Sequence, residues 1–539
     1  MDLIWSVPVA VLLIAALIIL LINRTGPNIG AAWFAAILAG VFVWGWTVSL
    51  YFRPDIQINP LPKTVDAFST RAVTGSFVFV LDSVSYPFML SVSALLVILM
   101  LTAPSYMEPQ TAPRLWFFYL LIEAIGFLSV SANDVTFIIY GWIIFDGIDL
   151  AAQYLQVRPG KIRRGFLTAV GVRFIGTLLA ASSLALSNSE LPKGVEAFIT
   201  PHAGAYLVTA CALRMGIIPV SQPYGEMSES RVGLGTMLRL VSALTVIPVL
   251  CRIPMSGMRP DLVTLLIIAG GFAALTGAVG WLLSESSFSG ISYAALSVCS
   301  IAFLCALNGE QNALIVWGVS IALTCGPLSL YQIRNRFMNI VAFLGIAVFA
   351  GLPYMPNAHG WAGLIRSRHA VQNLMYILVM TLLTAGSFVH VFRTEGKKFS
   401  ELEPWMRSVY PLGFFAAIGT HVFIGMTGFG EQFSLGVIPA SVSVFTGGLS
   451  LALLSVYLPE SIQTQNAAAW GRALLSFFWR AMRKMMDMEW LISIAERGSW
   501  ALRTLALAVS EVLENNGGLI WELLLMALLI AAAFGGGQF

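Results

Sequence analysis

The chain has 539 residues, of which 58% are hydrophobic and 11% are charged, and its formal net charge is +3. Soluble domains contain about 25% charged residues, and so small a net charge gives no sign of a nucleic-acid partner. The composition therefore excludes an ordinary soluble domain and predicts an integral membrane protein.

Apolar segments long enough to cross a membrane follow one another along the chain. The first is longer than a signal-peptide core and lacks a basic n-region, so we expect it to be retained. Because backbone polar groups in lipid must bond internally, these segments are expected to be helices. We predict an all-α membrane protein with about 16 transmembrane helices, at residues 3–23, 28–50, 78–103, 115–132, 134–156, 164–187, 203–220, 233–251, 261–283, 289–307, 312–330, 338–354, 370–392, 409–428, 436–457 and 518–535.

Two of the predicted helices, the seventh and the twelfth, are interrupted at corresponding places. Proline removes a backbone donor and clashes with the preceding turn. Breaks at membrane depth are tolerated inside protein or beside a water-filled cavity. Matching breaks predict two inverted repeats of about five helices each, although ordinary proline kinks would also account for them. The break residues are Pro219, Pro223, Gly351, Pro353 and Pro356.

The segment at 462–515 differs from the spans because it mixes aromatic and leucine residues with charges. This pattern predicts an amphipathic helix at the membrane surface, either extended along neighbouring subunits or folded back in two pieces. The whole chain then divides into helices 1–3 at 1–114, a first repeat (helices 4–8) at 115–252, a second repeat (helices 9–13) at 261–392, helices 14–15 at 393–461, the lateral amphipathic helix at 462–515 and an anchor helix at 516–539.

The loops between the spans indicate an orientation. Lysine and arginine are most frequent in the loop after the fifth span and in other loops on the same side, and cytoplasmic loops carry this excess. We therefore place the N-terminus outside and the segment at 462–515 inside. The basic residues are Arg158, Lys161, Arg163, Arg164, Arg334, Arg336, Arg393, Lys397, Lys398 and Arg407.

Several ionisable residues lie within the predicted spans, whereas every lysine lies outside them. A charge at bilayer depth costs at least about 3 kcal/mol on insertion scales. Such residues usually mark an ion path or a fixed internal pair. They are Asp82, Glu123, Asp146, Asp149, Arg173, Arg214 and Arg239.

The order of several motifs resembles the antiporter-like membrane subunits of respiratory complex I, membrane-bound hydrogenases and Mrp antiporters. The resemblance covers about 80–430 in the sequence, and the C-terminal segment is similar to the lateral helix and anchor of the largest such subunit. It implies a proton-translocating scaffold built from two repeats. The matching positions are Asp82 and Ser83 in the third span, Asn133 and Asp134 in a turn, Phe145 and Asp146 at the family's Trp-Glu, Arg214 and Pro219 at the family's lysine and proline, and the run AGLPYMPN at the second break.

Most of the proton-carrying residues implied by this resemblance are absent. The acid is kept as Asp146, but the first lysine has become Arg214, and Arg239 stands near a loop histidine. Arginine stays charged in proteins and cannot release a proton as a buried lysine can. The other basic positions of the family fall on or near Thr245, Phe288, Ser320, Thr324 and Trp361.

The retained charges allow two interpretations. If Asp146 and Arg214 meet, they form a fixed pair, which favours a structural role. Asp149 lies three residues further on a similar helix face, so one aspartate can stay protonated while the other pairs with Arg214. With Glu123 and Arg173 they form either a half-channel or a closed polar cluster. Glu123 alone is read as a helix-packing acid.

Three functions remain open on the sequence. The first is an antiporter-like subunit of a multi-subunit energy-converting complex in a bacterial cytoplasmic (inner) membrane, taking part in proton or sodium-ion translocation with other membrane subunits as partners in the lipid bilayer. The second is a non-conducting scaffold of such a complex, and the third is a membrane subunit for inorganic-carbon uptake. The cysteines and histidines show no metal-ligand spacing, and no catalytic, flavin, haem or iron–sulfur motif appears, so we expect neither a cofactor nor a metal.

Overall fold

The structure is a computed structural model with two compact units, Met1–Met486 and Asp487–Phe539. It describes residues 3–457 except for 26–27, 54–69, 75–76, 107–111, 157–163, 188–199, 221–231, 334, 366–369, 394–398 and 429–437, and after Tyr457 only scattered positions between 477 and 528. Those scattered positions are helical. The predicted lateral helix at 462–515 and the anchor at 516–539 therefore lie largely outside the described residues.

The described elements are almost all helices. In chain order they are α1 (Leu3–Thr25), α2 (Ile29–Tyr51), β1 (Thr70–Thr74), β2 (Phe77–Leu81), α3 (Ser85–Thr102), α4 (Ala112–Ser131), α5 (Val135–Gln156), α6 (Arg164–Leu186), α8 (Pro201–Arg214), α9 (Val232–Arg252), α10 (Pro260–Leu283), α11 (Ser287–Leu307), α12 (Gln311–Ser320), the π-helical turn η2 (Ile321–Cys325), α13 (Gly326–Leu330), α14 (Arg336–Ala350), α15 (Ala358–Ile365), α16 (Ala370–Arg393), α17 (Pro404–Gly428) and α18 (Ile438–Tyr457).

The prediction of an all-α membrane protein is confirmed. Among the described residues, 13 helices are long and apolar enough to cross a membrane. The shorter α8 and α14 occupy the seventh and twelfth predicted spans. The prediction missed the antiparallel hairpin of β1 and β2, in which Thr70 lies opposite Leu81. This hairpin is too short to change the class of the fold.

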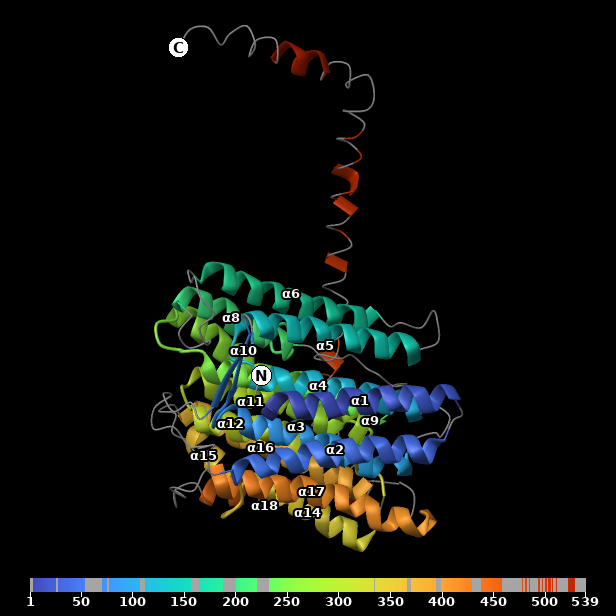
Figure 1. Cartoon of the computed structure of the whole chain (residues 1–539). Coiled ribbons are helices and arrows are strands. Elements are labelled where there is room, and N and C mark those ends of the chain that lie inside the picture. The colour runs from blue at the N-terminus through green and yellow to red at the C-terminus, as the bar shows by residue number, and fades with distance from the viewer. Residues whose placement is uncertain are drawn as a thin grey trace. The chain divides into compact units, whose positions relative to one another are not determined.

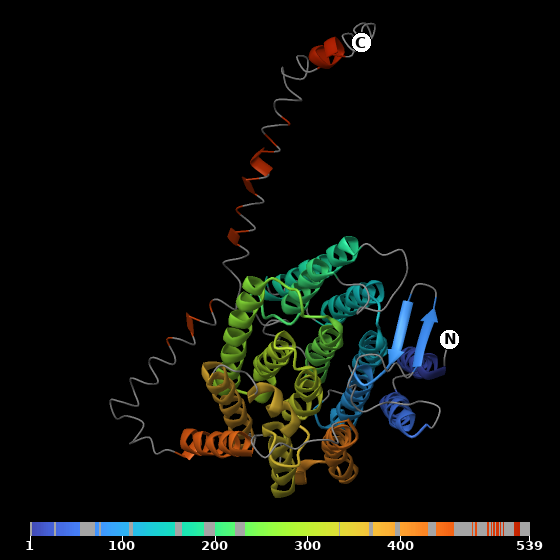
Figure 2. The same ribbon diagram turned by 90° about the vertical axis from the view of Figure 1, so that its left-hand side faces the viewer.

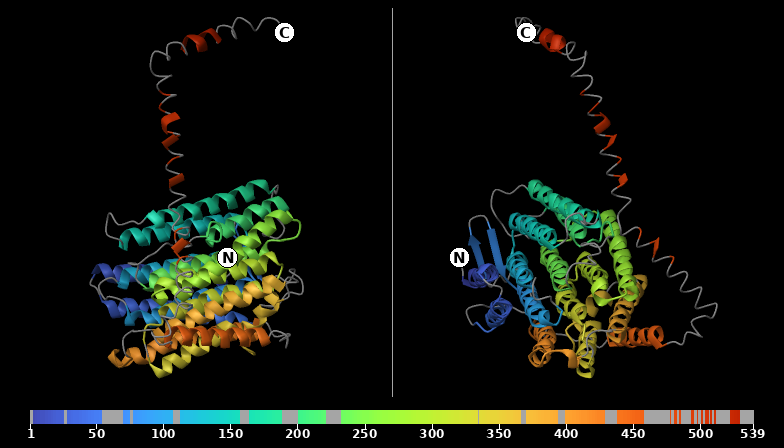
Figure 3. Two further views of the ribbon diagram at one scale, coloured as in Figure 1. Left: turned by 180° about the vertical axis from the view of Figure 1, so that it is seen from behind. Right: turned by 90° about the vertical axis from the view of Figure 1, so that its right-hand side faces the viewer.

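The helices of the first unit run side by side in one bundle (Figure 1). Its centre is made by α9, α11 and the segment α12–η2–α13, whose apolar windows are 100% buried. The view along the helices places α5, α6 and α8 at one edge and α14, α17 and α18 at the opposite edge (Figure 2). Helices α1 and α2 and the hairpin lie along a third side (Figure 3).

The outward face of the edge helix α6 is apolar. Phe174, Ile175 and Leu178 are about half exposed, while Arg173 and Thr177 of the same helix are buried. A helix with its polar side turned inward is expected where the surroundings are lipid or other apolar helices. The bundle therefore has the inverted polarity of a membrane protein at this edge.

Both interrupted segments contain helix ends. Helix α8 ends at Arg214 and is followed by turns up to Val220, while Pro223 lies outside the described residues. Helix α14 ends at Ala350, and its C-cap residue Gly351 adopts a left-handed conformation with φ of 69°. The turns that contain Pro353 and Pro356 then lead into α15. The inverted repeats and their pair of broken membrane helices stay predictions.

The eleventh predicted span departs from a regular helix. It consists of α12, the π-helical turn η2 and α13, which begins with Gly326 and Pro327. Proline cannot donate the hydrogen bond of a regular α-helix, and the regular helix is interrupted directly before it by a single π-helical turn. The sequence contains Gly326 and Pro327, but the segment 312–330 was predicted as one uninterrupted helix.

A buried ion pair joins three elements at one end of the bundle. Two Arg252 contacts, each 3.1 Å long, connect its Nη2 atom with both carboxylate oxygens of Asp82. Its Nη1 atom donates to the Ala132 carbonyl between α4 and α5. Asp82 also accepts from the backbone N–H groups of Val84 and Ser85 at the start of α3. Asp82 thus combines a capping role at the start of α3 with an ion pair that the sequence did not reveal.

We predict that Asp82→Asn destabilises the bundle although it preserves the cap. An asparagine oxygen can still accept from the first turn of α3, but Arg252 loses its counter-charge. Breaking a buried pair costs about 3–5 kcal/mol, so the thermal unfolding midpoint of the detergent-solubilised protein should fall clearly. Asp261→Asn, which changes an exposed acid of α10, is the matched control. Equal midpoints for the two variants would contradict the role of the pair.

We also predict that Gly351→Ala destabilises the end of α14. A Cβ at this position would lie 2.8 Å from backbone atoms of Asn357 and from Trp361 Cδ1, and the positive φ adds strain of about 1–3 kcal/mol. Thermal unfolding measures the effect. Gly45→Ala is the control because a Cβ there meets nothing within 4 Å; a G351A midpoint no lower than that of this control would contradict the prediction.

Candidate functional site

Four of the predicted site residues come together in one buried cluster, which we call the charge network: Asp146, Asp149, Arg173 and Arg214. Asp146 of α5 contacts both arginines: its carboxylate lies 3.1 Å from Arg173 Nη1 and 2.9 Å from Arg214 Nη1. Asp149, one turn further along α5, lies 2.7 Å from Arg173 Nη2. The network therefore joins α5, α6 and α8.

The network is buried and balanced in charge. The side chains of Asp149 and Arg214 are 0% exposed, that of Arg173 is 1% exposed, and that of Asp146 is 13% exposed. Two guanidinium groups face two carboxylates, so the four charges sum to zero. Because arginine stays charged in proteins, each buried cation requires one of these carboxylates nearby.

Arg214 makes further contacts that fix its position. Nη2 lies 3.2 Å from the other Asp146 oxygen, which makes the pair two-pronged, and Nη1 donates to the Thr177 hydroxyl at 2.9 Å. Its guanidinium carbon lies 4.6 Å from the centre of the Trp142 ring. Two-pronged pairing and stacking on an aromatic face are properties of arginine that lysine does not reproduce.

The close approach of α6 and α8 has a local cause in Gly176. A Cβ at this position would lie 3.0 Å from Arg214 Cγ and 3.1 Å from the Ala210 carbonyl oxygen. Glycine therefore lets α8 pack directly on α6, three residues beyond Arg173. The spacing of the two aspartates on α5 turns both toward α6, since residues three apart share a helix face.

The turn before α5 is also ordered by an acid. Asp134 accepts a hydrogen bond from the Phe137 backbone N–H at 3.0 Å and so caps the helix that carries both network aspartates. Burial raises the pKa of this carboxyl, and the backbone hydrogen bonds partly oppose that rise. Asn133 donates its backbone N–H to the Val78 carbonyl of β2.

Glu123 and Arg239 stand apart from the charge network. Glu123 lies on α4 and is 0% exposed. Arg239 lies on α9, donates to the Phe288 carbonyl at 3.1 Å and stacks 5.2 Å from the centre of the Phe288 ring. The predicted grouping of Glu123 with the four residues of the charge network stays a prediction, because no described hydrogen bond joins Glu123 to them.

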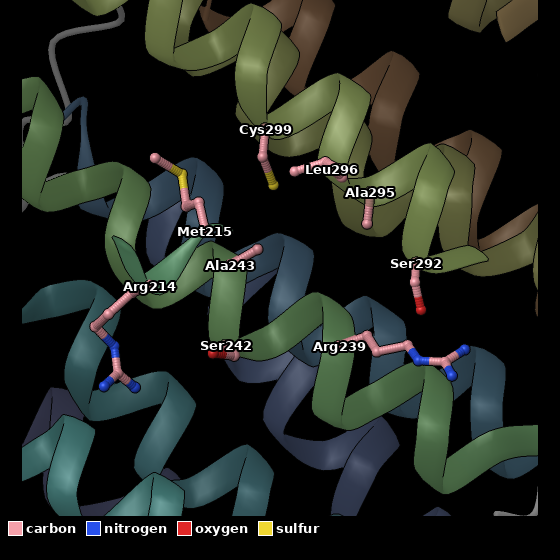
Figure 4. A pocket seen from close by; sticks show the side chains of 9 residues that line it. All are labelled: Arg214, Met215, Arg239, Ser242, Ala243, Ser292, Ala295, Leu296 and Cys299. Carbon is pink, nitrogen blue, oxygen red and sulfur yellow. The ribbon is translucent and has the colours of Figure 1, made fainter. Parts of the chain in front are cut away.

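A small cavity of about 10 Å³ lies between α8, α9 and α11 (Figure 4). Its polar lining consists of Arg214, Arg239, Ser242 and Ser292. The guanidinium group of Arg214 points away from it, toward the charge network, and that of Arg239 extends on the side of Ser292 (Figure 4). The volume is close to the minimum that holds one water molecule.

The second half contains a neutral polar cluster at the position of the expected second break. Ser320 donates to Asn357 Oδ1 at 2.9 Å, and His421 Nε2 lies 3.0 Å from the same oxygen. All three residues are buried. The contacts join α12, the segment before α15, and α17. The described residues of this cluster carry no fixed charge, in contrast with the charge network.

The sequence missed several partners in these sites. Trp142 precedes Asp146 by four residues and Thr177 follows Arg173 by four, so helical spacing alone identifies both as neighbours on the same face. Arg252 was overlooked because it stands at the end of a span. His421 was missed because its partner Asn357 lies far away in the sequence.

No protein-family model and no curated protein matches the sequence, but solved structures share its fold. A chain in the structure of an Mrp complex from Dietzia sp. DQ12-45-1b aligns with a TM-score of 0.68 and 15% identity, over 99% of this chain and 63% of that chain. This chain therefore spans less than two thirds of the length of that chain.

Two further solved structures extend the comparison. A chain of the membrane-bound sulfane sulfur reductase, an archaeal respiratory membrane complex, aligns with a TM-score of 0.65 and 15% identity, over 97% of this chain and 99% of that chain. A chain of respiratory complex I from Thermus thermophilus with bound NADH aligns with a TM-score of 0.50 and 17% identity, over 89% and 99%. At the level of the fold, these similarities confirm the resemblance that the motifs indicated.

We predict that Asp149→Asn is more harmful alone than together with Arg173→Gln. The single change leaves two buried guanidinium groups facing one carboxylate, which should cost about 3–5 kcal/mol. The double change leaves the Asp146–Arg214 pair balanced. Thermal unfolding of both variants in the same detergent measures the difference. A double variant that is less stable than the single one would show that charge balance does not govern this site.

Proposed function

We propose that this protein is an antiporter-like membrane subunit of a multi-subunit energy-converting complex and takes part in moving protons or sodium ions across the membrane. The similarity of fold to chains from three respiratory or Mrp membrane complexes supports the proposal. The observation that carries it is the buried charge network, because charges are retained at bilayer depth mainly where ions or protons pass, or where they hold each other.

The charge network would set the electrostatic potential along the ion path. Asp146 stands where the resemblance implies the conducting acid, and Arg214 replaces the lysine. A lysine can change its charge when buried, whereas this arginine is held by Asp146, Thr177 and Trp142. The network therefore acts as a set of charges that stay constant beside the ion path.

The same replacement favours a second candidate function, a non-conducting scaffold of such a complex. In that case the network would hold α5, α6 and α8 in place for assembly and no ion would pass. The neutral cluster of Ser320, Asn357 and His421 fits this alternative, because Ser320 stands where the resemblance implies a basic residue. No feature of the structure favours inorganic-carbon uptake.

We further propose the surroundings in which this function operates. The protein would lie in a bacterial cytoplasmic membrane with its N-terminus outside, in contact with lipid and with other membrane subunits. The segments 115–252 and 261–392 would form two inverted repeats, and the segment at 462–515 would lie along the membrane surface. The apolar outward face of α6 is consistent with contact with lipid.

Proton flux in sealed vesicles that contain the whole native complex tests the proposal. We expect the complex to translocate more protons, or sodium ions in a parallel assay, than the same complex assembled without this chain. Asp146→Asn should remove the difference, because the remaining charges leave one excess positive charge that repels cations. Exposed Glu285→Gln is the control. Unchanged flux in D146N with weakened assembly would instead support the scaffold.

A further inference from the structure

Glu123 is the most isolated carboxyl group in the described part of the bundle. Its side chain is 0% exposed, and neither carboxyl oxygen has a hydrogen-bond partner among the described residues. Nearly all buried polar side chains have such a partner. A packing role alone does not explain why a polar group of this kind is kept inside α4.

Three acids within or beside the described spans behave differently from Glu123. Asp82 contacts Arg252, Asp149 contacts Arg173, and Asp146 contacts two arginines. Each of these acids faces a cation that cannot lose its charge. Binding a proton at any of them would leave a buried guanidinium group without its counter-charge, which is strongly unfavourable.

The neighbours of Glu123 can be placed from close contacts along α4. A Cβ at Gly126 would lie 2.6 Å from Val241 of α9 and 3.4 Å from Val92 of α3. The hydroxyl groups of Tyr119 and Tyr106 lie where a Cβ at Gly233, near the start of α9, would sit. Tyr119, Glu123 and Gly126 are spaced four and three residues apart, so they share one face of α4. Glu123 therefore faces the α9 side of the bundle.

The helices around α4 bring no described counter-charge to Glu123. Helices α1, α2, α3, α5 and α9 and strand β2 pack against α4. No ion pair joins Glu123 to any described residue, and none of the described titratable groups on these elements is hydrogen-bonded to it. These groups are Arg24, Tyr51, Tyr86, Tyr140, Asp146, Asp149, Arg239, Cys251 and Arg252, together with Arg114 and Tyr119 on α4 itself.

We propose that Glu123, rather than Asp146, is the residue that binds the transported proton in the first half of the bundle. This inference rests on the proposed function. A carboxyl group buried without a partner holds a proton in place of a charge. Releasing that proton leaves a carboxylate and taking up another restores the neutral group, so no arginine pair has to break.

Two tyrosines lie on the side of α4 that faces α9, and in this inference they would relay the proton between Glu123 and one end of the bundle. Tyr119 lies one helical turn before Glu123 on the same face, and its hydroxyl lies close to that of Tyr106, which follows the end of α3 and is half-buried. Each phenol hydroxyl accepts one proton and passes on its own, so both tyrosines are unchanged after a transfer.

Two substitutions at Glu123 distinguish proton binding from packing. Glu123→Gln keeps the size and shape of the side chain but removes the exchangeable proton. Glu123→Asp keeps the acid but shortens it. We expect E123Q to lose the share of proton flux that this chain contributes to the native complex, and E123D to retain part of it. A packing role predicts the reverse order, and that order would overturn the inference.

The controls separate this inference from the proposed function. The chain's share is defined by comparing vesicles of the wild-type complex with vesicles of the complex lacking the chain, at equal amounts of assembled complex, with E285Q as the matched glutamate control. If the share is zero, the proposed function fails and the inference fails with it. If the share is clear and E123Q retains it, the inference alone fails.

Infrared spectroscopy of the purified complex gives a readout that does not depend on flux. A protonated carboxyl group has a C=O stretch that shifts in heavy water, and the spectrum of the wild type minus that of E123Q should contain this band. E123D should show a similar band at a shifted frequency. A carboxylate band in place of the protonated one would overturn the inference even if E123Q assembles poorly.

Discussion

One carboxylate, that of Asp146, contacts two buried guanidinium groups from different helices, and the arrangement at this edge of the bundle depends on it. Without Asp146, Arg173 would keep one partner and Arg214 would keep neutral contacts with Thr177 and Trp142. Neutral contacts do not compensate a charge in a low-dielectric interior. The packing of α5, α6 and α8 is therefore an electrostatic arrangement as much as an apolar one.

A buried lysine–glutamate pair can both supply charge and exchange protons, whereas the arginine–aspartate pairs of this arrangement supply charge only. Arg173 and Arg214 supply charge that does not vary, and the aspartates balance it. A group that exchanges protons therefore has to be a different residue. Glu123 on α4 is not hydrogen-bonded to Arg173 or to Arg214. Replacing lysine by arginine in a carrier of this kind thus changes which residue can gain or lose a proton. A residue that occupies a motif position is therefore not necessarily the residue that conducts the proton.

Much of the fold followed from the sequence, because long apolar segments leave the backbone little choice other than a helix. The sequence left open whether Asp146 and Arg214 meet, and in the structure they do. Local chemistry was harder to predict. The π-helical turn before Gly326 and Pro327, the Asp82–Arg252 pair and the contact of Asn357 with His421 depend on which distant helices pack together. That Glu123 has no hydrogen-bond partner among the described residues could not be predicted from the sequence, since this depends on which distant side chains pack around it.

Gly176 gives the charge network a mechanical property. Because no side chain separates α6 from α8 at this point, the backbone of one helix rests against the stem of Arg214. The arginine, its helix and the carboxylate it contacts must move as one body or come apart together. Any sliding of α8 relative to α5 would separate the guanidinium group of Arg214 from the Asp146 carboxylate, so a conformational shift driven from elsewhere in an assembly would perform electrical work at this edge.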